Sequence, residues 1–257
     1  MKTVCILVAT AVLAVAPAFA QGAGDARVVA FNASVRVEVD AAGKPVKVEA
    51  PADLPEAIRG FIEKRVASWQ YEPAKQGGVP ASAVTFVRVG ACAIPVAEGY
   101  RMGLDFKGNG PAIVNAGPWF MPPPRYPHEM QRMAVEGEFK VSYAIQADGT
   151  TRIASIEPMA GTGSRHLKAF RGALTSWIEG LRYQPEQVDG RPVATDMTFP
   201  VSFTLSTHGG PRSNAAYREE LEARALASKE CLAASSPGGP LPIATNSPVK
   251  VIPTPAG

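Results

Sequence analysis

The residues that could do chemistry in this chain are three histidines, three cysteines and one glycine-rich loop. His128, His166 and His208 are scattered, and no His-Glu-x-x-His zinc motif or Gly-x-Ser-x-Gly nucleophile elbow is present in the sequence. The loop "GTGSRH" (161–166) precedes a predicted helix, but no Lys-Ser or Lys-Thr pair follows it, as a phosphate-binding loop would require. We therefore expect no catalytic residues, no metal and no cofactor, and we interpret the histidines as surface residues.

The cysteines bear on the compartment in which the chain works. Residues 1–20 have one basic residue, an apolar core and the small-x-small site "AFA", which is typical of a cleavable export signal. The apolar core is shorter than the ~20 residues that span a bilayer, although a retained membrane anchor is an alternative. Export to the periplasm would leave Cys92 and Cys231, an even pair that predicts a disulfide in an oxidising compartment. Two buried, unpaired thiols are the alternative.

Charge argues against two classes of partner. The 26 Lys and Arg residues and 23 Asp and Glu residues nearly balance, which gives no argument for nucleic acid. No run of basic residues suggests binding to an anionic membrane surface. No stretch after the signal is long and apolar enough to span, so we expect no membrane span after signal cleavage.

The chain repeats one pattern. The segment "WQYEPAKQGGVP" (69–80) is followed by "LRYQPEQVDGRPV" (181–193), and four residues recur 112 positions apart: Tyr71 and Tyr183, Pro73 and Pro185, Gly78 and Gly190, Pro80 and Pro192. Four matches in register are unexpected by chance. The sequence therefore predicts an internal duplication.

Each copy reads as strand, strand, helix, strand. In the first, Val35–Val39 alternates apolar and polar residues as a half-buried strand does, and apolar residues at helical spacing follow from Leu54 to Trp69. In the second, residues 139–145 alternate and residues 167–181 have helical spacing. The fold class predicted is α+β, with two tandem units, each a small antiparallel sheet packed on one helix. Trp69 and Trp177 are expected to fill the cores.

Domain boundaries follow from these elements. We expect a first unit at 27–95, a linker with an extra hairpin at 96–117, a second unit at 118–207, a helix at 211–235 and a disordered tail at 236–257, where Pro, Gly and Ser dominate. Trp119, Phe120 and Met121, just before the second unit, either cover the junction between the units or offer a partner site.

The second unit resembles the C-terminal domain of TonB, the periplasmic end of the transducer that energises outer-membrane transporters. The residues that carry the resemblance are "PRYPHEMQRMAVEGEFKVSYAIQADG" (124–149), then "LRYQP", "DGRPV" and the closing strand "MTFPVSFTL" (197–205). The first unit has the turn, the helix, "WQYEP" and a last strand, but it lacks the Tyr-Pro and Glu-Gly pairs. We interpret it as a degenerate copy.

The resemblance implies a non-enzymatic function, because such domains bind an extended transporter peptide by adding it to their last strand. The partner-binding residues carried over are Asp196, Met197, Thr198, Phe199, Val201, Ser202, Phe203, Tyr126 and Pro127. Pro200 lies inside this strand and independently predicts a sheet edge, since proline cannot donate to a ladder. It either marks the docking edge or protects an exposed edge from aggregation.

Two functions stay open at this point. In the first, the chain is an exported module that accepts an extended peptide, for example from a TonB-dependent outer-membrane transporter. In the second, the two units pair their sheet edges internally as a structural pseudo-dimer without a transport role. TonB transducers have an uncleaved membrane helix and a long spacer, which this sequence is not expected to have, so energy transduction is not predicted. The partner and the oligomeric state are not predicted.

Overall fold

The computed structural model describes residues 29–96, 99–114, 121–159, 162, 166–205 and 241–253. These residues form a mixed α+β structure with mostly antiparallel sheets and few helices, which confirms the predicted α+β class, while the two tandem units stay a prediction. The predicted signal peptide (1–20) and the predicted helix (211–235) lie outside the described residues.

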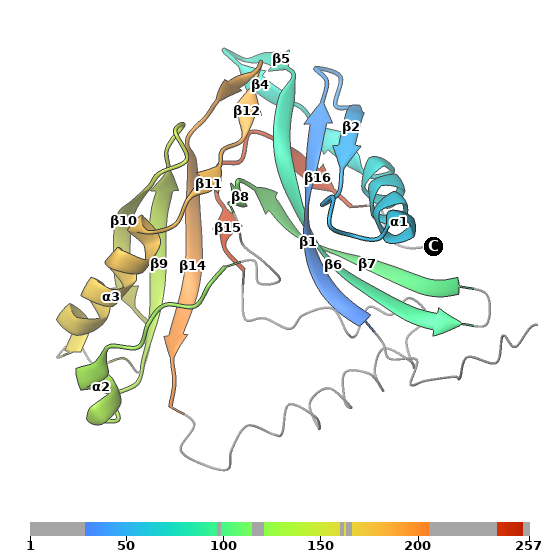
Figure 1. Ribbon diagram of the computed structural model, residues 1–257. Coiled ribbons are helices and arrows are strands. Elements are labelled where there is room, and N and C mark those ends of the chain that lie inside the picture. The colour runs from blue at the N-terminus through green and yellow to red at the C-terminus, as the bar shows by residue number, and fades with distance from the viewer. Residues whose placement is uncertain are drawn as a thin grey trace, which may run out of the picture.

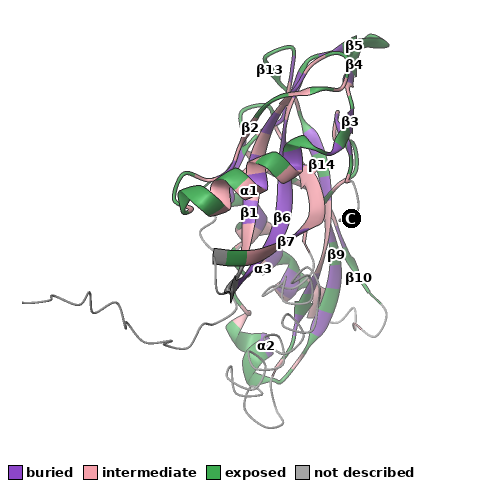
Figure 2. Ribbon diagram, turned by 90° about the vertical axis from the view of Figure 1, so that its right-hand side faces the viewer, coloured by how far each residue is buried: buried purple, intermediate pink, exposed green. Residues whose placement is uncertain are grey.

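Alternating valines build a first, six-stranded sheet in the order β13-β12-β6-β1-β2, with β7 also paired to β6. Its long elements are β1 (Val29–Val39), β2 (Pro45–Glu49), β6 (Ala83–Val96), β7 (Gly99–Gly110) and the helix α1 (Glu56–Ala67) that covers one face. Val35, Val37 and Val39 point into the core below α1, where they are almost fully buried. Figure 2 shows the exposed outer side of α1 and the buried strands behind it.

A second, four-stranded sheet has the order β10-β9-β14-β15. Its elements are β9 (Gly137–Ile145), β10 (Thr151–Pro158), β14 (Thr195–Phe203), the helix α3 (Leu167–Glu179) and the short helix α2 (His128–Arg132). Both helices lie on the outer side of this sheet, away from the first one (Figure 1). Phe139, Phe170 and Phe203 meet at the centre of its core.

Short strands join the two sheets where they converge. They are β3 (Gln70–Glu72), β4 (Ala74–Gln76), β5 (Val79–Ala81), β8 (Ala112–Ile113), β11 (Tyr183–Gln184), β12 (Gln187–Val188), β13 (Arg191–Pro192), β15 (Ile243–Ala244) and β16 (Lys250–Ile252).

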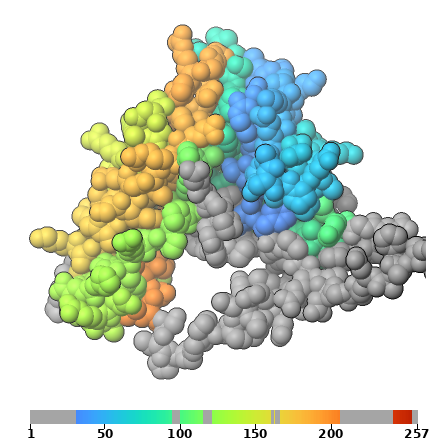
Figure 3. Space-filling model, in the orientation of Figure 1, coloured from blue at the N-terminus to red at the C-terminus, as the bar shows by residue number. Residues whose placement is uncertain are grey.

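The pairing of these short strands crosses between the halves of the chain. β12 from the second half pairs with β6, β8 from the first half pairs with β11, and β16 from the C-terminal segment returns to pair with β3. The space-filling view in Figure 3 shows residues of both halves in contact at the top of the molecule. The two halves are therefore interlocked through backbone hydrogen bonds.

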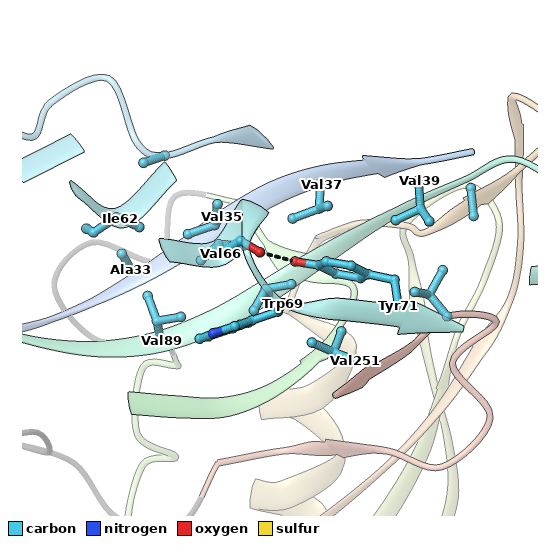
Figure 4. Packing of buried hydrophobic residues seen from close by; sticks show 14 of the residues in the cluster. Ala33, Val35, Val37, Val39, Ile62, Val66, Trp69, Tyr71, Val89 and Val251 are labelled. Atoms are coloured by element: carbon cyan, nitrogen blue, oxygen red, sulfur yellow. Dashed lines mark hydrogen bonds between the residues drawn. The ribbon is translucent and has the colours of Figure 1, made fainter. Parts of the chain in front are cut away.

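The C-terminal segment corrects one expectation. A disordered tail was predicted for 236–257, but residues 241–253 contain β15 and β16. Val249 and Val251 are buried in the first core, and Val251 lies beside Trp69 and Tyr71 (Figure 4). This segment has too few apolar residues to form a core of its own. It needs none, because Val249 and Val251 complete the core of the first sheet.

The two tryptophans pack differently. Trp69 is 4% exposed and meets Phe106 edge to face in the first core. Trp177 is only half-buried; it packs on Phe199 and donates its indole N–H to the carbonyl oxygen of Pro122. Trp177 therefore links Pro122, in the segment before α2, to Phe199 in the second sheet.

One close contact recurs in both halves. Gly43 has φ +82°, and a Cβ placed there would lie 2.3 Å from the carbonyl oxygen of Tyr71. Gly149 has φ +80°, and a Cβ placed there would lie 2.1 Å from the carbonyl oxygen of Tyr183. Only glycine fits, because the backbone is left-handed and the neighbouring carbonyl leaves no room for a side chain. This contact explains why the turn glycine and the Tyr-x-Pro motif recur together.

We predict that Gly149→Ala destabilises the chain by at least about 1–3 kcal/mol, since it adds backbone strain and a clash with Tyr183. Gly172→Ala is the control: it lies in α3 with open space around it, and it should stabilise by about 0.5–1 kcal/mol. Urea unfolding of both variants measures the difference. Similar changes in both would show that the turn contact does not matter.

Candidate peptide-binding edge

The strand β14 holds seven of the predicted partner-binding residues in one fixed register. It pairs with β9 over its whole length, from Thr195 opposite Ile145 to Phe203 opposite Gly137, without a bulge. Met197, Val201 and Phe203 are buried in the second core, which prevents the strand from slipping by one residue. This register fixes which backbone N–H and C=O groups of β14 point away from β9 and can bind a partner strand.

The outward-facing backbone groups are identified by the contacts of Asp196. Its carbonyl oxygen accepts the N–H of Thr245 at 2.8 Å, and its own N–H donates to the Oδ1 of Asn246 at 2.6 Å. Alternate residues of a strand turn their backbone groups to the same side. Thr198, Pro200 and Ser202 therefore also face outward.

Pro200 is thus one of the outward-facing residues, as expected for a proline at a sheet edge. Its missing N–H points away from β9, so the ladder between β14 and β9 loses no hydrogen bond. On the outer side, Pro200 offers a carbonyl oxygen but no donor. The outer edge can therefore pair, with one donor fewer than a regular strand.

The first part of this edge is already occupied. Ile243 and Ala244 in β15 pair antiparallel with Thr198 and Met197. The side chain of Asn246 also donates to the carboxylate of Asp196 at 3.0 Å. Among the described residues, no strand pairs with the outer side of β14 from residue 199 to 203.

Two further predicted residues lie inside the domain. Tyr126 packs its ring 5.3 Å from that of Phe203 and donates its hydroxyl hydrogen to the carbonyl oxygen of Val135 at 2.8 Å. Pro127 comes directly before α2. The structure therefore places Tyr126 behind β14, where it supports Phe203 from the core side, and not on the outer edge.

The family comparison agrees with this geometry. Residues 122–205 match the model of the Gram-negative bacterial TonB protein C-terminal domain. Residues 122–205 form a TonB C-terminal domain. The first half of the chain lies outside the match, and no curated protein matches the chain. Domains of this family are periplasmic and mediate protein interactions.

Other predicted features concern the cysteines, metal ions and the membrane. Cys92 is fully buried in β6, and Cys231 lies outside the described residues, so their disulfide stays a prediction. Within the described ranges, no group of three or more His, Cys, Asp or Glu side chains could hold a metal ion. No helix in the described part of the chain has the length and apolar character to cross a bilayer.

The sequence did not reveal a buried carboxyl group where the TonB C-terminal domain meets the first sheet. Glu186 is 0% exposed and accepts hydroxyl hydrogen bonds from Thr85 at 2.6 Å, Ser247 at 2.7 Å and Thr195 at 3.1 Å. These donors come from β6, the C-terminal segment and β14. The one signal in the sequence is a difference between the two copies: the first copy has Ala74 where the second copy has Glu186.

A buried cation lies near this carboxyl group and fixes the C-terminal segment. Arg88 is 6% exposed and donates to the carbonyl oxygens of Pro242 at 2.8 Å and Asn109 at 3.3 Å. The side-chain amide of Asn109 donates in turn to the carbonyl oxygen of Val249 at 2.9 Å. Burial lowers the pKa of Arg88, and the nearby Glu186 opposes this change. The C-terminal segment is thus held at several points to the β6–β7 hairpin.

Burial raises the pKa of Glu186 above its ordinary value of 4.5, against the opposing effect of the three hydroxyl donors. The folded chain then favours the protonated carboxyl. We predict that the stability of the wild-type chain relative to Glu186→Gln is highest below pH 4.5 and falls as the pH rises through the raised pKa.

Urea unfolding of both proteins across this range measures the change. Glu129→Gln, at an exposed position in α2, is the control for loss of a carboxylate. A constant difference between wild type and Glu186→Gln across the range would contradict the raised pKa.

Proposed function

We propose that the chain is an exported, non-enzymatic interaction module of the periplasm. Its TonB C-terminal domain accepts an extended peptide by strand addition to the outer edge of β14. The observation that carries this proposal is that the edge already pairs with an extended segment, β15, and that no described strand pairs with its outer side from residue 199 to 203. The residues of the edge are Asp196, Met197, Thr198, Phe199, Val201, Ser202 and Phe203.

The backbone supplies the affinity. Pro200 and Ser202 offer outward carbonyl oxygens, and Ser202 offers an outward N–H. Each hydrogen bond contributes a net ~0.5–1.5 kcal/mol, so a peptide along this stretch gains only a few kcal/mol. Such a total favours a modest, reversible association.

The partner proposed is a protein segment, for example one from a TonB-dependent outer-membrane transporter. Removal of a signal peptide at residues 1–20 would release the chain into the periplasm. The role that we propose there is that of an adaptor or competitor, which binds the same transporter segments.

We also propose that the first half is a degenerate tandem copy of the domain. Both halves have the order strand, strand, helix, strand, and both contain the turn glycine against the tyrosine carbonyl. The alternative function, a structural pseudo-dimer, is favoured by a specific observation. β7 covers the edge of β6, and β8 and β16 each pair with a strand of the other half.

The two proposed functions predict different effects of Ser202→Pro on the capture of a partner segment. This change removes an outward N–H from an exposed position and leaves the ladder to β9 intact. We predict that the wild-type chain captures transporter segments from periplasmic and outer-membrane extract, and that Ser202→Pro lowers the capture about tenfold, for a loss of about 1.4 kcal/mol.

Ser202→Ala keeps the N–H and is the matched control, and near-UV circular dichroism checks that all three proteins are folded. Capture that is equal for Ser202→Pro and Ser202→Ala would contradict strand addition at this edge. Absence of any capture would favour the structural pseudo-dimer.

The disulfide between Cys92 and Cys231 is part of the proposal for an exported chain. We predict that alkylation of the denatured, unreduced periplasmic protein labels neither cysteine, and that labelling of both follows reduction. Mass spectrometry counts the labels. Labelling before reduction would show that the two thiols are unpaired.

A further inference from the structure

We propose that residues Ile243–Asn246 are a built-in occupant of the docking edge, which a partner of similar sequence must displace. This inference rests on the proposed function, because it assumes that β14 is a docking edge. The occupant shows which backbone groups and side-chain positions the edge recognises. It therefore indicates the chemistry of the partner.

The occupant has a shorter ladder at β14 than farther along the segment. β15 has two residues, and Ile243 is 60% exposed. In β16, by contrast, Val251 is buried, the backbone pairs with three residues of β3, and Lys250 pairs with Glu72 at 2.7 Å. β15 can therefore leave the edge while β16 stays in place as an anchor, once Pro242 also gives up the hydrogen bond from Arg88.

The surroundings of the occupant leave room for this movement. A cavity of about 550 Å³ borders the C-terminal segment on the side of β7. Its lining includes Arg88, Lys107, Asn109, Thr245, Ser247 and Lys250. The segment between the two strands and β7 thus line the cavity from different sides.

The position of Ala244 requires a small residue. Its partner across the ladder, Met197, is buried, so the side chain of Ala244 faces the second core. A Cβ placed on Gly110 would lie 2.9 Å from the Cβ of Ala244, which shows how closely β7 approaches. A larger residue opposite Met197 would collide with this backbone.

The position of Asn246 requires an amide side chain. Its Oδ1 accepts the N–H of Asp196, and its Nδ2 donates to the Asp196 carboxylate. A carboxylate in its place would repel Asp196. The partner that fits is an extended, antiparallel segment with a small residue and, two positions later, an asparagine.

A labelled peptide tests this inference on the full-length chain. The probe is fluorescein-labelled "LPIATNS", the sequence of residues 241–247. Thr245→Pro removes the N–H that Asp196 accepts and should open the edge, whereas Thr245→Ala keeps that N–H and is the control. A tethered segment acts at an effective concentration on the order of mM, so the wild-type chain should bind the probe weakly.

We expect Thr245→Pro to bind the probe about tenfold or more tightly than wild type and Thr245→Ala. In the latter two proteins β15 occupies the edge, so only the small fraction of molecules with a free edge can bind the probe, and the apparent affinity falls by that fraction. Fluorescence anisotropy measures the affinities, and near-UV circular dichroism checks the fold. Probes with A244L or N246A should bind Thr245→Pro about tenfold more weakly.

Equal affinity of all three proteins would overturn displacement, and so would a lack of binding to folded Thr245→Pro. Equal affinity of the changed probes would overturn the sequence rule. In the register of β15, the probe ends opposite Pro200 and does not reach Ser202. Failure here is therefore distinct from failure of the capture experiment with Ser202→Pro.

Discussion

The carboxyl group of Glu186 sets a constraint on the whole structure. A buried carboxyl is costly unless hydrogen bonds replace its water, and here three hydroxyl groups do so. Thr85 belongs to the first sheet, Thr195 to the second and Ser247 to the C-terminal segment. These three parts of the chain must converge for the group to be satisfied. The convergence of the two sheets and the return of the chain end are thus parts of one arrangement.

Some strands of this molecule are covered at one edge by another part of its own chain. Strand β7 covers β6, β15 covers the start of β14, and β8 and β16 add to short strands of the opposite half. Exposed edges invite pairing with other chains, so such coverage protects against aggregation. Among the described residues, the outer sides of β2, β7 and β10 have no such cover, and neither has the outer side of β14 from residue 199 to 203. Pro200 limits what can pair there, since it offers an acceptor and no donor.

The same physics therefore serves protection and recognition. A covering strand satisfies the backbone of an edge, and a partner strand does the same, so the two compete for one set of hydrogen bonds. We propose that a partner strand can replace the two-residue cover β15, whereas the long pairing of β7 with β6 stays in place. Binding would accordingly be confined to the TonB C-terminal domain, and the first half would serve to anchor the chain end.

The sequence alone was enough to predict the α+β class and the strand β14, because local periodicity depends on neighbouring residues. It was also enough to predict the TonB C-terminal domain, because the motifs of that domain can be read from short stretches of sequence. It was misleading for residues 241–253, whose composition resembles a disordered tail. Those residues become ordered through partners far away in the chain, such as Trp69 for Val251. Tertiary structure also decided that Pro200 faces outward and that Glu186 is buried. Both depend on strand register and on contacts between the halves, which local sequence patterns do not encode.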